Sequence, residues 1–263
     1  MGKSGRKPSG ADALLYGRHA VAAALANPER RWRRLVVLAG HEEDATALVA
    51  GARAMRHPYV VDRGGATISV LDQSGFAAIL PRHAVHQGLA LEVEPLPEPG
   101  LEDVLRAGPA SGRCIIVVLD QLSDPQNIGA VMRSAAAFGA LAVVISAHGA
   151  PAKTGALAKA ASGALENVPL VRVVNLARAL DRLKGAGFWV CGLDETAPQP
   201  LAQLDAGERV AIVLGSEGGG IRRLVRERCD FSARLPTRPA QPTLNVSTAA
   251  AVALYELTRG RDD

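Results

Sequence analysis

Residues that could do chemistry gather in three polar stretches of this 263-residue chain. In the first stretch, 119–140, Asp124 and Pro125 fit the N-cap and the first position of a helix that carries Asn127 and Arg133. Only small residues lie one helical turn from Arg133, so a ligand or another backbone could approach its guanidinium group. A surface arginine on a helix packed closely against a sheet explains the same pattern.

The second stretch, 212–230, contains a glycine-rich turn. A buried strand is expected to end at Gly215, and Gly218–Gly220 precede a helix. Glycines in such a turn allow positive φ angles and a close approach of the backbone to a ligand. The spacing differs from the G-x-G-x-x-G dinucleotide fingerprint, and Glu217 would repel a pyrophosphate. The turn therefore suits a ligand with amine or hydroxyl donors, or a cation, unless it is a plain glycine-rich turn.

The third stretch places Thr243, Asn245, Ser247 and Thr248 in front of a helix whose residues 249–254 are all apolar. A helix that is apolar on every face is expected to be buried. Two explanations of the polar run stay open. Either Ser247 or Thr248 caps the helix by accepting hydrogen bonds from its first N–H groups, or the loop holds a ligand.

Alternating strands and helices must position these stretches. From residue 113, continuous apolar runs predict strands buried on both faces of a parallel sheet, at 114–120, 141–146, 169–173, 188–194 and 209–215. Helices are predicted at 127–139, 154–166, 175–185 and 220–229. This alternation is typical of a doubly wound α/β fold, whose ligands bind beyond the carboxyl ends of the strands.

A smaller α/β pattern precedes this sheet. Helices are predicted at 17–27 and 41–55, and strands at 33–40, 57–61 and 87–96. The linker, rich in proline and glycine, is expected to hold at most one short helix. We therefore expect a disordered basic tail at 1–10, a small domain at 11–95, a linker at 96–112 and a second domain at 113–263.

Composition narrows the function classes. The chain is 48% hydrophobic and 21% charged, as expected for globular domains, and no apolar run approaches the ~20 residues that span a bilayer. Its three cysteines lie far apart, which predicts reduced thiols and not a zinc site or a disulfide framework. No apolar stretch of signal-peptide type follows the N-terminus, so we expect a cytoplasmic protein without membrane or metal partners.

Positive charge is concentrated near the N-terminus. The net charge is +4, and eight basic residues fall within the first 34 positions, among them Arg18, Arg30, Arg31, Arg33 and Arg34. A polyanion such as RNA is one explanation of this cluster, and a solubilising surface is the other. The aromatic content of 3% argues against a base-stacking platform made of many aromatic side chains.

Together and in this order, the three stretches resemble the SpoU/TrmH family of RNA 2'-O-ribose methyltransferases, members of the SPOUT class. The resemblance rests on Asn127, Gly129, Arg133, Phe138 and Gly139 in the first motif, on Gly215, Glu217 and Gly218 in the second, and on Thr243, Leu244, Asn245, Val246 and Ser247 in the third. Near the N-terminus, "YGRHAV" and "HQGLAL" are similar to the RNA-binding domain of the branch that modifies large-subunit ribosomal RNA. The resemblance thus reaches both predicted domains.

The resemblance implies an α/β fold: a C-terminal parallel-sheet SPOUT domain with a trefoil knot, preceded by a small ribosomal-protein-like (L30e-like) RNA-binding domain. It implies S-adenosylmethionine as cofactor, held by Leu214, Gly215, Leu235, Pro236, Leu244 and Ser247. It implies catalytic roles for Asn127, Arg133, Glu217, Thr243 and Asn245. It makes RNA the expected partner of Arg18, Arg30, Arg31, Arg33 and Arg34, and a homodimer the expected assembly.

Methyl transfer from a sulfonium to a ribose hydroxyl is an in-line displacement, which needs alignment of oxygen, methyl and sulfur but no metal. We expect Arg133 to hold the adjacent phosphate and stabilise the developing alkoxide, because a guanidinium with a pKa above ~12 is a poor base. Asn127 and Asn245 would orient the ribose or Arg133. Glu217 would pair with Arg133 or hold its neighbours.

Three features depart from the family pattern. Thr243 stands where serine is usual, and Asn167 stands where many relatives have histidine. The loop before Thr243 is rich in proline where glycine is common, which should stiffen it. Thr243 keeps the hydroxyl group but adds a methyl group, so a catalytic role for this side chain has weaker support than the other roles.

The expected activity is S-adenosylmethionine-dependent 2'-O-ribose methylation of RNA, with a guanosine of 23S ribosomal RNA as the expected target. Within the class, a transfer-RNA guanosine methyltransferase and an adenosine methyltransferase of the antibiotic-resistance type are alternatives. From other classes come a non-catalytic RNA-binding ribosome assembly factor and a small-molecule oxidoreductase. The absence of a dinucleotide fingerprint argues against the oxidoreductase.

Overall fold

The structure is a computed structural model that describes residues 14–55, 67–82, 84–149, 155–205, 207–238 and 243–259. Its contacts divide the chain into two compact units. Unit 1 comprises Met1–Pro97 and Ala152–Asn167, and unit 2 comprises Glu98–Pro151 and Val168–Asp263. A segment from the second half of the sequence therefore belongs to the first unit.

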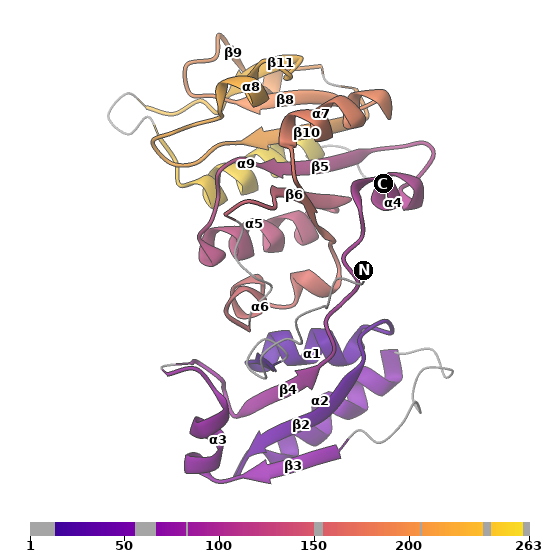
Figure 1. The fold of residues 1–263 in the computed structure, drawn as a ribbon, viewed down its shortest axis with the longest axis vertical. Coiled ribbons are helices and arrows are strands. Elements are labelled where there is room, and N and C mark those ends of the chain that lie inside the picture. The colour runs from indigo at the N-terminus through magenta and orange to yellow at the C-terminus, as the bar shows by residue number, and fades with distance from the viewer. Residues whose placement is uncertain are drawn as a thin grey trace, which may run out of the picture. The chain divides into compact units, whose positions relative to one another are not determined.

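Unit 1 is built on a four-stranded sheet of order β1-β4-β2-β3 (Figure 1). Its strands are β1 (Leu14–Tyr16), β2 (Trp32–Leu38), β3 (Thr67–Leu71) and β4 (Leu89–Val93). Its helices are α1 (Arg18–Ala26), α2 (Glu42–Met55), α3 (Gln73–Ile79) and α6 (Gly155–Ala161), and η2 (Ala164–Glu166) is a 3-10 turn. β2 and β3 are parallel, whereas β4 is antiparallel to β1 and β2.

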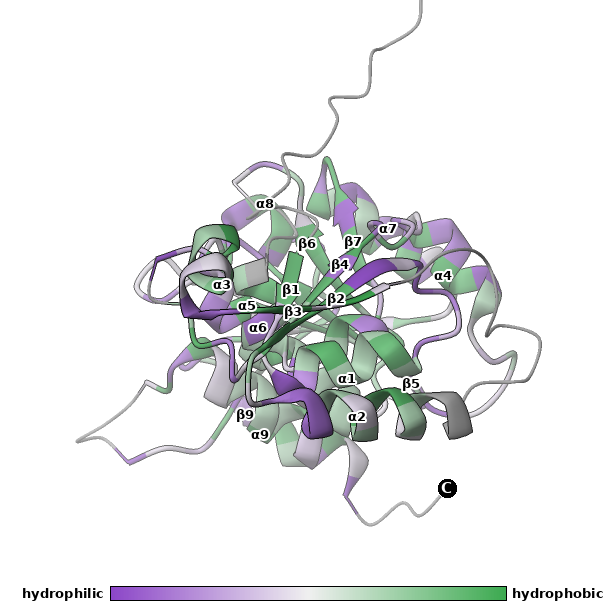
Figure 2. Ribbon diagram, turned by 90° about the horizontal axis from the view of Figure 1, so that it is seen from below, coloured by the Kyte–Doolittle hydropathy of each residue, from purple (hydrophilic) through white to green (hydrophobic). Residues whose placement is uncertain are grey.

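Apolar clusters hold unit 1 together on both faces of the sheet. Leu35 and Val37 of β2 pack in one cluster with residues of α1 and α2, whereas Val36 packs in another with Phe76 of α3. Side chains of a strand alternate between the two faces, so the two clusters are separated by the sheet itself. In Figure 2, α2 begins with hydrophilic residues, among them Glu42, Glu43 and Asp44, and becomes more hydrophobic farther along.

Most elements predicted for unit 1 are confirmed. The helices at 17–27 and 41–55 and the strands at 33–40 and 87–96 are present as α1, α2, β2 and β4. The sequence pattern did not predict β1, β3 or α3, because elements of three to seven residues contain too few periods to be distinguished from loop. The strand predicted at 57–61 lies outside the described residues.

Unit 2 is built on a seven-stranded sheet of order β7-β6-β5-β10-β8-β11-β9, and its described pairings are all parallel. Its strands are β5 (Cys114–Leu119), β6 (Ala142–Ser146), β7 (Leu170–Val173), β8 (Trp189–Leu193), β9 (Gln199–Pro200), β10 (Arg209–Leu214) and β11 (Phe231–Arg234). Its helices are α4 (Leu101–Ala107), α5 (Pro125–Ala137), α7 (Leu176–Gly185), α8 (Arg223–Arg226) and α9 (Val246–Thr258), with a 3-10 turn η3 (Leu201–Gln203).

Helices cover both faces of this sheet. Residues of α4, α7 and α8 pack in one cluster with alternate residues of β5, Cys114, Ile116 and Val118. α5 and α9 contact each other outside that cluster, and all six residues of β5 are buried. Burial on both faces confirms the predicted doubly wound parallel sheet.

Two expectations about helices of unit 2 are wrong. The helix expected at 220–229 is the single turn α8, because Gly220 has a φ of 60° and Arg222 is not helical. The C-terminal helix is not buried on every face, because 42% of Val252 and 55% of Tyr255 are exposed on α9. α9 packs against α5 and η3, and Val252 and Tyr255 lie on its exposed side.

Within the described residues, no helix is long and apolar enough to cross a membrane. The α/β class, the parallel sheet and the preceding small domain are as predicted. The trefoil knot, which came from the family resemblance, stays a prediction.

Candidate active site

The start of α5 fixes the first motif at the carboxyl edge of the sheet. The carboxylate of Asp124 accepts hydrogen bonds from the backbone N–H groups of Gln126 and Asn127, at 3.1 and 3.2 Å, and Pro125 occupies the first turn. Asp124 is therefore the N-cap, as predicted. This cap places Asn127 in the first turn of the helix, close to where β5 ends.

The glycine-rich turn after β10 is closed by its own backbone. Ser216 and Gly220 form a bridge, in which the Gly220 N–H donates to the Ser216 carbonyl at 2.8 Å. A Cβ atom on Gly215 would lie 2.0 Å from the carbonyl carbon of Gly220, so a larger residue would force the turn open. Gly218 and Gly220 have φ angles of 78° and 60°, which favour glycine. Glu217 is exposed within this turn.

The side chain of Asn245 joins the three motifs. Its amide nitrogen donates to Oδ1 of Asn127 at 3.1 Å and to Oε1 of Glu217 at 2.6 Å. The same Glu217 oxygen accepts a long hydrogen bond from the Val246 N–H at 3.4 Å. Asn245 thus contacts one residue that lies 118 positions away in the sequence and another that lies 28 positions away.

Asn245 is also the N-cap of α9. Its side-chain oxygen accepts from the Ser247 N–H at 2.9 Å and from the Ser247 hydroxyl at 2.6 Å. The alternative that Ser247 or Thr248 caps this helix is wrong, because Asn245 is the N-cap and Ser247 already lies in the first turn of α9. One side chain therefore caps the helix with its oxygen and binds the other two motifs with its nitrogen.

Among the described contacts, Arg133 lies outside this hydrogen-bonded group. Arg133 is exposed on α5 and makes no hydrogen bond or ion pair with the described residues. Of the two roles expected for Glu217, a pair with Arg133 is absent from the described contacts, and the carboxylate instead accepts hydrogen bonds from Asn245 and Val246. Thr243 is exposed two residues before Asn245.

The predicted cofactor residues follow strands that end at the same edge of the sheet. Leu214 ends β10 and is buried, and Leu235 and Pro236 follow β11. β8 lies between these two strands and is parallel to both, so their carboxyl ends are one strand apart. Leu244 is 37% exposed and precedes Asn245, whose amide group reaches Glu217 in the glycine-rich turn.

Asp120 and Arg222 form a further contact at this edge. The Asp120 side chain is fully buried, and its carboxylate accepts from the backbone N–H, Nε and Nη2 of Arg222 at 2.8, 2.8 and 2.7 Å. The Asp120 N–H donates to the carbonyl of Leu214, so β5 and β10 stay paired up to this point. The sequence showed a carboxylate at the end of a buried strand but not its partner, which lies 102 positions away.

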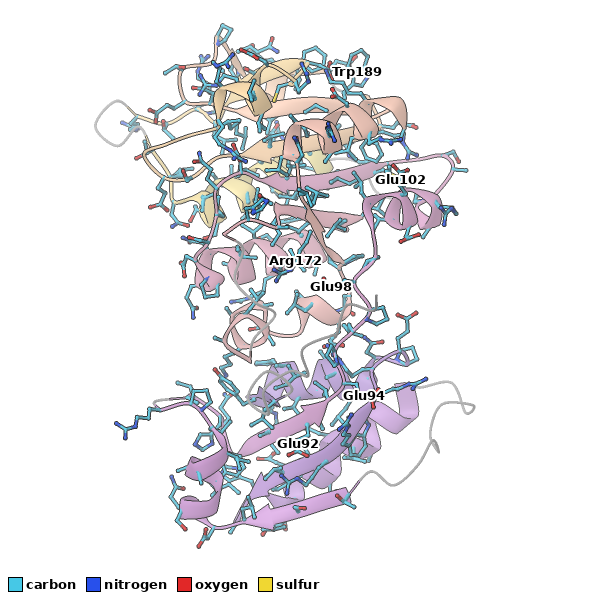
Figure 3. All side chains as sticks on the ribbon, viewed as in Figure 1. Glu92, Glu94, Glu98, Glu102, Arg172 and Trp189 are labelled. Atoms are coloured by element: carbon cyan, nitrogen blue, oxygen red, sulfur yellow. The ribbon has the colours of Figure 1, made fainter. Side chains whose placement is uncertain are left out.

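Most of the predicted RNA-binding arginines are ion-paired within unit 1. The pairs are Arg18 with Asp44, Arg30 with Glu166, Arg33 with Glu94 and Arg34 with Glu92. Figure 3 labels Glu92 and Glu94, on and just after β4. Arg30 is only 8% exposed and binds Glu166 through two hydrogen bonds, so its side chain is not accessible to RNA here. Arg31 is exposed.

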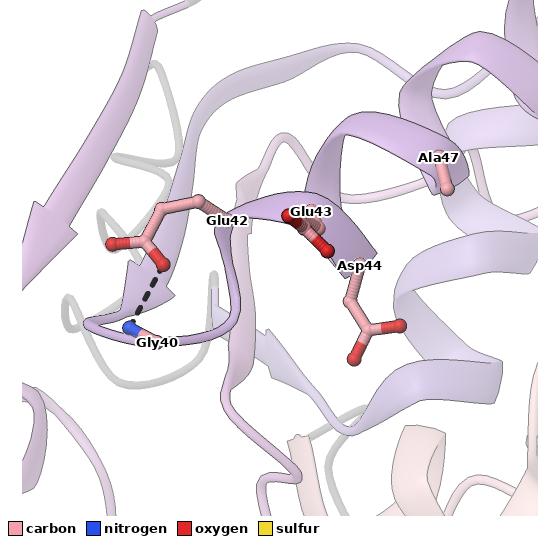
Figure 4. Close-up of a pocket in the computed structure, with 5 residues that line it drawn as sticks. All are labelled: Gly40, Glu42, Glu43, Asp44 and Ala47. Atoms are coloured by element: carbon pink, nitrogen blue, oxygen red, sulfur yellow. Dashed lines mark hydrogen bonds between the residues drawn. The ribbon is translucent and has the colours of Figure 1, made fainter.

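An acidic hollow in unit 1 is unsuited to RNA. It is lined by Gly40, Glu42, Glu43, Asp44 and Ala47 at the start of α2 (Figure 4). Glu42 accepts a hydrogen bond from the Gly40 N–H at 2.8 Å, and the three carboxylates would repel phosphate groups. An RNA strand is therefore expected to avoid this hollow.

The buried and half-buried cysteines are expected to be unreactive thiols. Cys114 and Cys191 are buried, and Cys229 is half-buried. Burial raises the pKa of the Cys191 thiol to about 12 and that of Cys229 to about 11, which keeps both protonated at neutral pH. Among the described residues there is no group of three or more histidine, cysteine or acidic side chains placed to hold a metal ion.

Comparison with protein families matches both units. The model of the SpoU rRNA methylase family matches residues 114–255. The chain belongs to the SpoU rRNA methylase family. A second model, described as RNA 2'-O ribose methyltransferase substrate binding, matches residues 14–99. These matches confirm the predicted family and enzyme class, RNA 2'-O-ribose methyltransferase, and with them the use of S-adenosylmethionine.

Individual relatives resemble the chain over most of its length. The 23S rRNA (guanosine-2'-O-)-methyltransferase RlmB of Coxiella burnetii is 37% identical, over 94% of this chain and 96% of the relative. The Synechocystis tRNA/rRNA methyltransferase slr0955, described as uncharacterized, is 36% identical over 94% of this chain, which spans only 62% of that relative. Among solved structures, the SpoU methyltransferase AviRb of Streptomyces viridochromogenes has a TM-score of 0.76 at 22% identity, over 95% of this chain and 90% of AviRb. That likeness confirms the fold.

Proposed function

We propose that this enzyme methylates the ribose 2'-hydroxyl of a guanosine in 23S ribosomal RNA, and that its reaction takes place where Asn127, Glu217 and Asn245 meet. The observation that carries the proposal is the amide group of Asn245, which donates to both other side chains at the carboxyl edge of the sheet. Ligands of doubly wound sheets bind at this edge. The identity of 37% to an RlmB enzyme over almost the whole chain supports the 23S guanosine as the target.

The residues at this edge fit S-adenosylmethionine. Gly215, Leu235, Pro236 and Leu244 combine aliphatic side chains with backbone groups in loops, a set that can enclose an adenine and hydrogen-bond its edge. The turn at Gly215 leaves no room for a Cβ atom, so its backbone path is tightly constrained. When bound, this cofactor supplies an electrophilic methyl group on a sulfonium.

The protein side chains then position the ribose and stabilise charge. Arg133 is exposed and has no partner among the described residues, so its guanidinium group is available to the phosphate next to the target ribose. From there it would stabilise the oxygen as its proton leaves. Glu217 holds Asn245, and Asn245 holds Asn127, so these three groups keep the loops in register for an in-line attack. Thr243 would contact the ribose from the same loop.

RNA would reach this site with help from the basic residues of unit 1. Arg31 is exposed, and the ion pairs of Arg18 and Arg33 are solvent-exposed, so each is weak enough to exchange for a phosphate contact. Arg34 is a half-buried member of the same group. Arg30 holds Glu166 in the interior, and we assign it a structural role.

The proposed assembly is a homodimer in the cytoplasm. The side of α9 that carries Val252 and Tyr255 is an apolar surface, which a second copy of the chain would cover. Light scattering would give the mass in solution, and a monomer under assay conditions would remove this part of the proposal. The cytoplasmic location follows from the proposed ribosomal substrate.

The experiment that tests the function uses total RNA from a strain that lacks the protein. Purified enzyme and labelled S-adenosylmethionine are added, and nuclease mapping locates the label. Label at one guanosine 2'-oxygen of 23S RNA is the expected result. Label in transfer RNA alone would replace the substrate and keep the chemistry, and the name of the Synechocystis relative includes both RNA classes.

A non-catalytic assembly factor is the alternative from another class. It predicts no label in naked RNA and none in assembling ribosomal particles from the same strain. That combined result would overturn the proposed function. A titration with S-adenosylmethionine would then show whether the cofactor site has been retained.

A further inference from the structure

A second hollow lies at the carboxyl edge of the sheet in unit 2, and the proposed reaction does not use it. It has a volume of about 460 Å³ and is formed where β5, β6 and β7 end, beside the first turns of α7 and α8. Its lining includes Gln121, His148, Val174, Arg223 and Leu224. This volume is within the range of about 300–1,000 Å³ that small-ligand sites occupy.

The hollow is basic. Its described lining contains two arginines and one histidine and no carboxylate, in contrast to the acidic hollow of Figure 4. Arg222 is held by the fully buried Asp120, so its guanidinium group has a fixed position in the wall. Arg223 pairs only with Glu227 among the described residues, and both side chains are exposed. Such a pair is weak, so Arg223 can exchange Glu227 for a phosphate group.

Uncovered aliphatic side chains complete the lining. Val174 is 75% exposed and Leu224 is 59% exposed, although both are large and apolar. Aliphatic side chains beside positive charge can accommodate an unpaired nucleotide, whose base has an apolar face and whose phosphate is an anion. Ser146 and Asn175 add polar groups to the lining, although the Asn175 side chain caps α7.

The hollow borders the proposed active site through Gln121. This residue has a φ of 60°, an uncommon angle for a residue other than glycine, in the loop that leads from β5 to Asn127. Its amide nitrogen lies 3.8 Å from the place where a Cβ atom on Gly219 would be, so it reaches the glycine-rich turn. Backbone angles of this kind persist where the surrounding structure holds them, and they concentrate at functional sites.

We propose that this hollow binds an unpaired nucleotide of the substrate RNA, within a few positions of the nucleotide that is methylated. The base lies against Val174 and Leu224, the phosphate is held by Arg223 and His148, and Gln121 contacts the base edge. This inference rests on the proposed function, because it assumes that RNA is bound at the neighbouring site. It adds a second contact to the strand, which would hold the target ribose in place during methyl transfer.

The test replaces side chains that line the hollow but have no part in the methyl-transfer site. Arg223→Glu and Leu224→Asp are made in the full chain, since both side chains are exposed and neither change leaves a buried charge. Arg222 is left intact, because its loss would leave the Asp120 carboxylate buried without a partner. Arg182→Glu on α7 is the matched control, because its exposed side chain pairs with Glu102 and does not line the hollow.

The assay uses 23S RNA from a strain that lacks the protein. We expect Arg223→Glu and Leu224→Asp each to raise the KM for RNA about tenfold, while the Kd for S-adenosylmethionine and the melting temperature stay as in the unaltered protein. Arg182→Glu should leave the KM unchanged. An unchanged KM in both hollow variants, with the unaltered enzyme active, would overturn the inference and leave the proposed function intact. An inactive unaltered enzyme would instead count against the proposed function.

A crosslink gives a readout that does not depend on turnover. A photoreactive phenylalanine in place of Leu224, in the full chain mixed with the same RNA, should crosslink to a nucleotide near the methylated one. The same substitution at Arg182 should not do so. Crosslinks from position 224 that scatter over the RNA would overturn the inference, and so would crosslinks to a second protein chain alone.

Discussion

The side-chain amide of Asn245 both accepts and donates hydrogen bonds, so one residue serves two purposes. Its carbonyl oxygen caps α9, and its amide nitrogen donates to Asn127 and Glu217. The sequence showed the polar run and left capping and ligand binding as alternatives. The two alternatives concern different atoms of the same loop. The order of residue types in a sequence does not tell which atom of a side chain binds which partner.

Substitution at Asn245 separates these two functions. Asn245→Ala removes the cap and the amide donor, and should lower the free energy of unfolding by about 1 kcal/mol. Asn245→Ser keeps an oxygen that can cap the helix, so it should lose less stability, but turnover should fall as far as in Asn245→Ala. Urea unfolding and a methylation assay check the two effects. Equal turnover in Asn245→Ser and the unaltered enzyme would show that the link to Glu217 is not needed.

Arg133 is expected to contribute to turnover but not to the affinity for S-adenosylmethionine. Arg133→Ala should reduce turnover by about 10²- to 10³-fold, the usual effect of removing one donor to a developing oxyanion, with little change in the Kd for S-adenosylmethionine. Arg133→Lys should recover only part of the rate, because an ammonium group lacks the planar fork of a guanidinium. Arg106→Ala is the control, since this exposed arginine of α4 pairs only with Asp103 among the described residues. Full turnover in Arg133→Ala would remove Arg133 from the mechanism.

At the scale of elements, the apolar pattern of the sequence predicted the longer strands of unit 2 and missed the short ones. The buried strands β5, β6, β8 and β10 were expected within one or two residues of where they lie. β11 was missed because Phe231–Arg234 is short, and because its serine and arginine interrupt the apolar run that marked the other strands. The residues that follow a missed strand, such as Leu235, could be assigned only through the family motif.

The glycine-rich turn gives a prediction about an element. Gly215→Ala would put a Cβ atom 2.0 Å from the carbonyl carbon of Gly220, so the bridge between Ser216 and Gly220 must open. We expect at least a tenfold loss of affinity for S-adenosylmethionine, together with a loss of stability of at least about 1 kcal/mol. Isothermal titration and thermal unfolding measure the two effects.

Gly185→Ala is the matched control for this turn. A Cβ atom at Gly185 would meet nothing within 4 Å, and this residue ends α7 in a helical conformation. Alanine should therefore stabilise the protein by up to about 1 kcal/mol and leave cofactor binding unchanged. If Gly215→Ala behaved like Gly185→Ala, the tight turn would not be required for the cofactor.

At the scale of the molecule, unit 1 is completed by a segment far away in sequence. Gly163 approaches α1 so closely that a Cβ atom there would lie 2.4 Å from the Cβ of Ala23, and the Arg30 side chain binds Glu166. The sequence predicted one helix at 154–166, whereas the structure has the shorter α6, a break at Ser162 and Gly163, where φ is positive, and then η2. A local pattern contains no information on which sheet such a helix packs against, because the contacts join residues more than a hundred positions apart.

The Arg30–Glu166 ion pair tests how much this segment contributes to unit 1. The side chains of Arg30 and Glu166 are 7% and 4% exposed, and Nη2 of the arginine lies 2.5 Å from Oε1 of the glutamate. Arg30→Met would leave the Glu166 carboxylate buried without its charged partner, at an expected cost of about 3–5 kcal/mol in urea unfolding of the full chain. Arg30→Met combined with Glu166→Leu removes both charges and should cost much less than the sum of the two single changes. Arg33→Met is the control, because its pair with Glu94 is exposed and should contribute below about 1 kcal/mol. Additive costs in the double variant would mean that the two side chains do not interact in solution, so that α6 and η2 are held in unit 1 by apolar packing and by other hydrogen bonds, such as the one from Lys159 to Gln87.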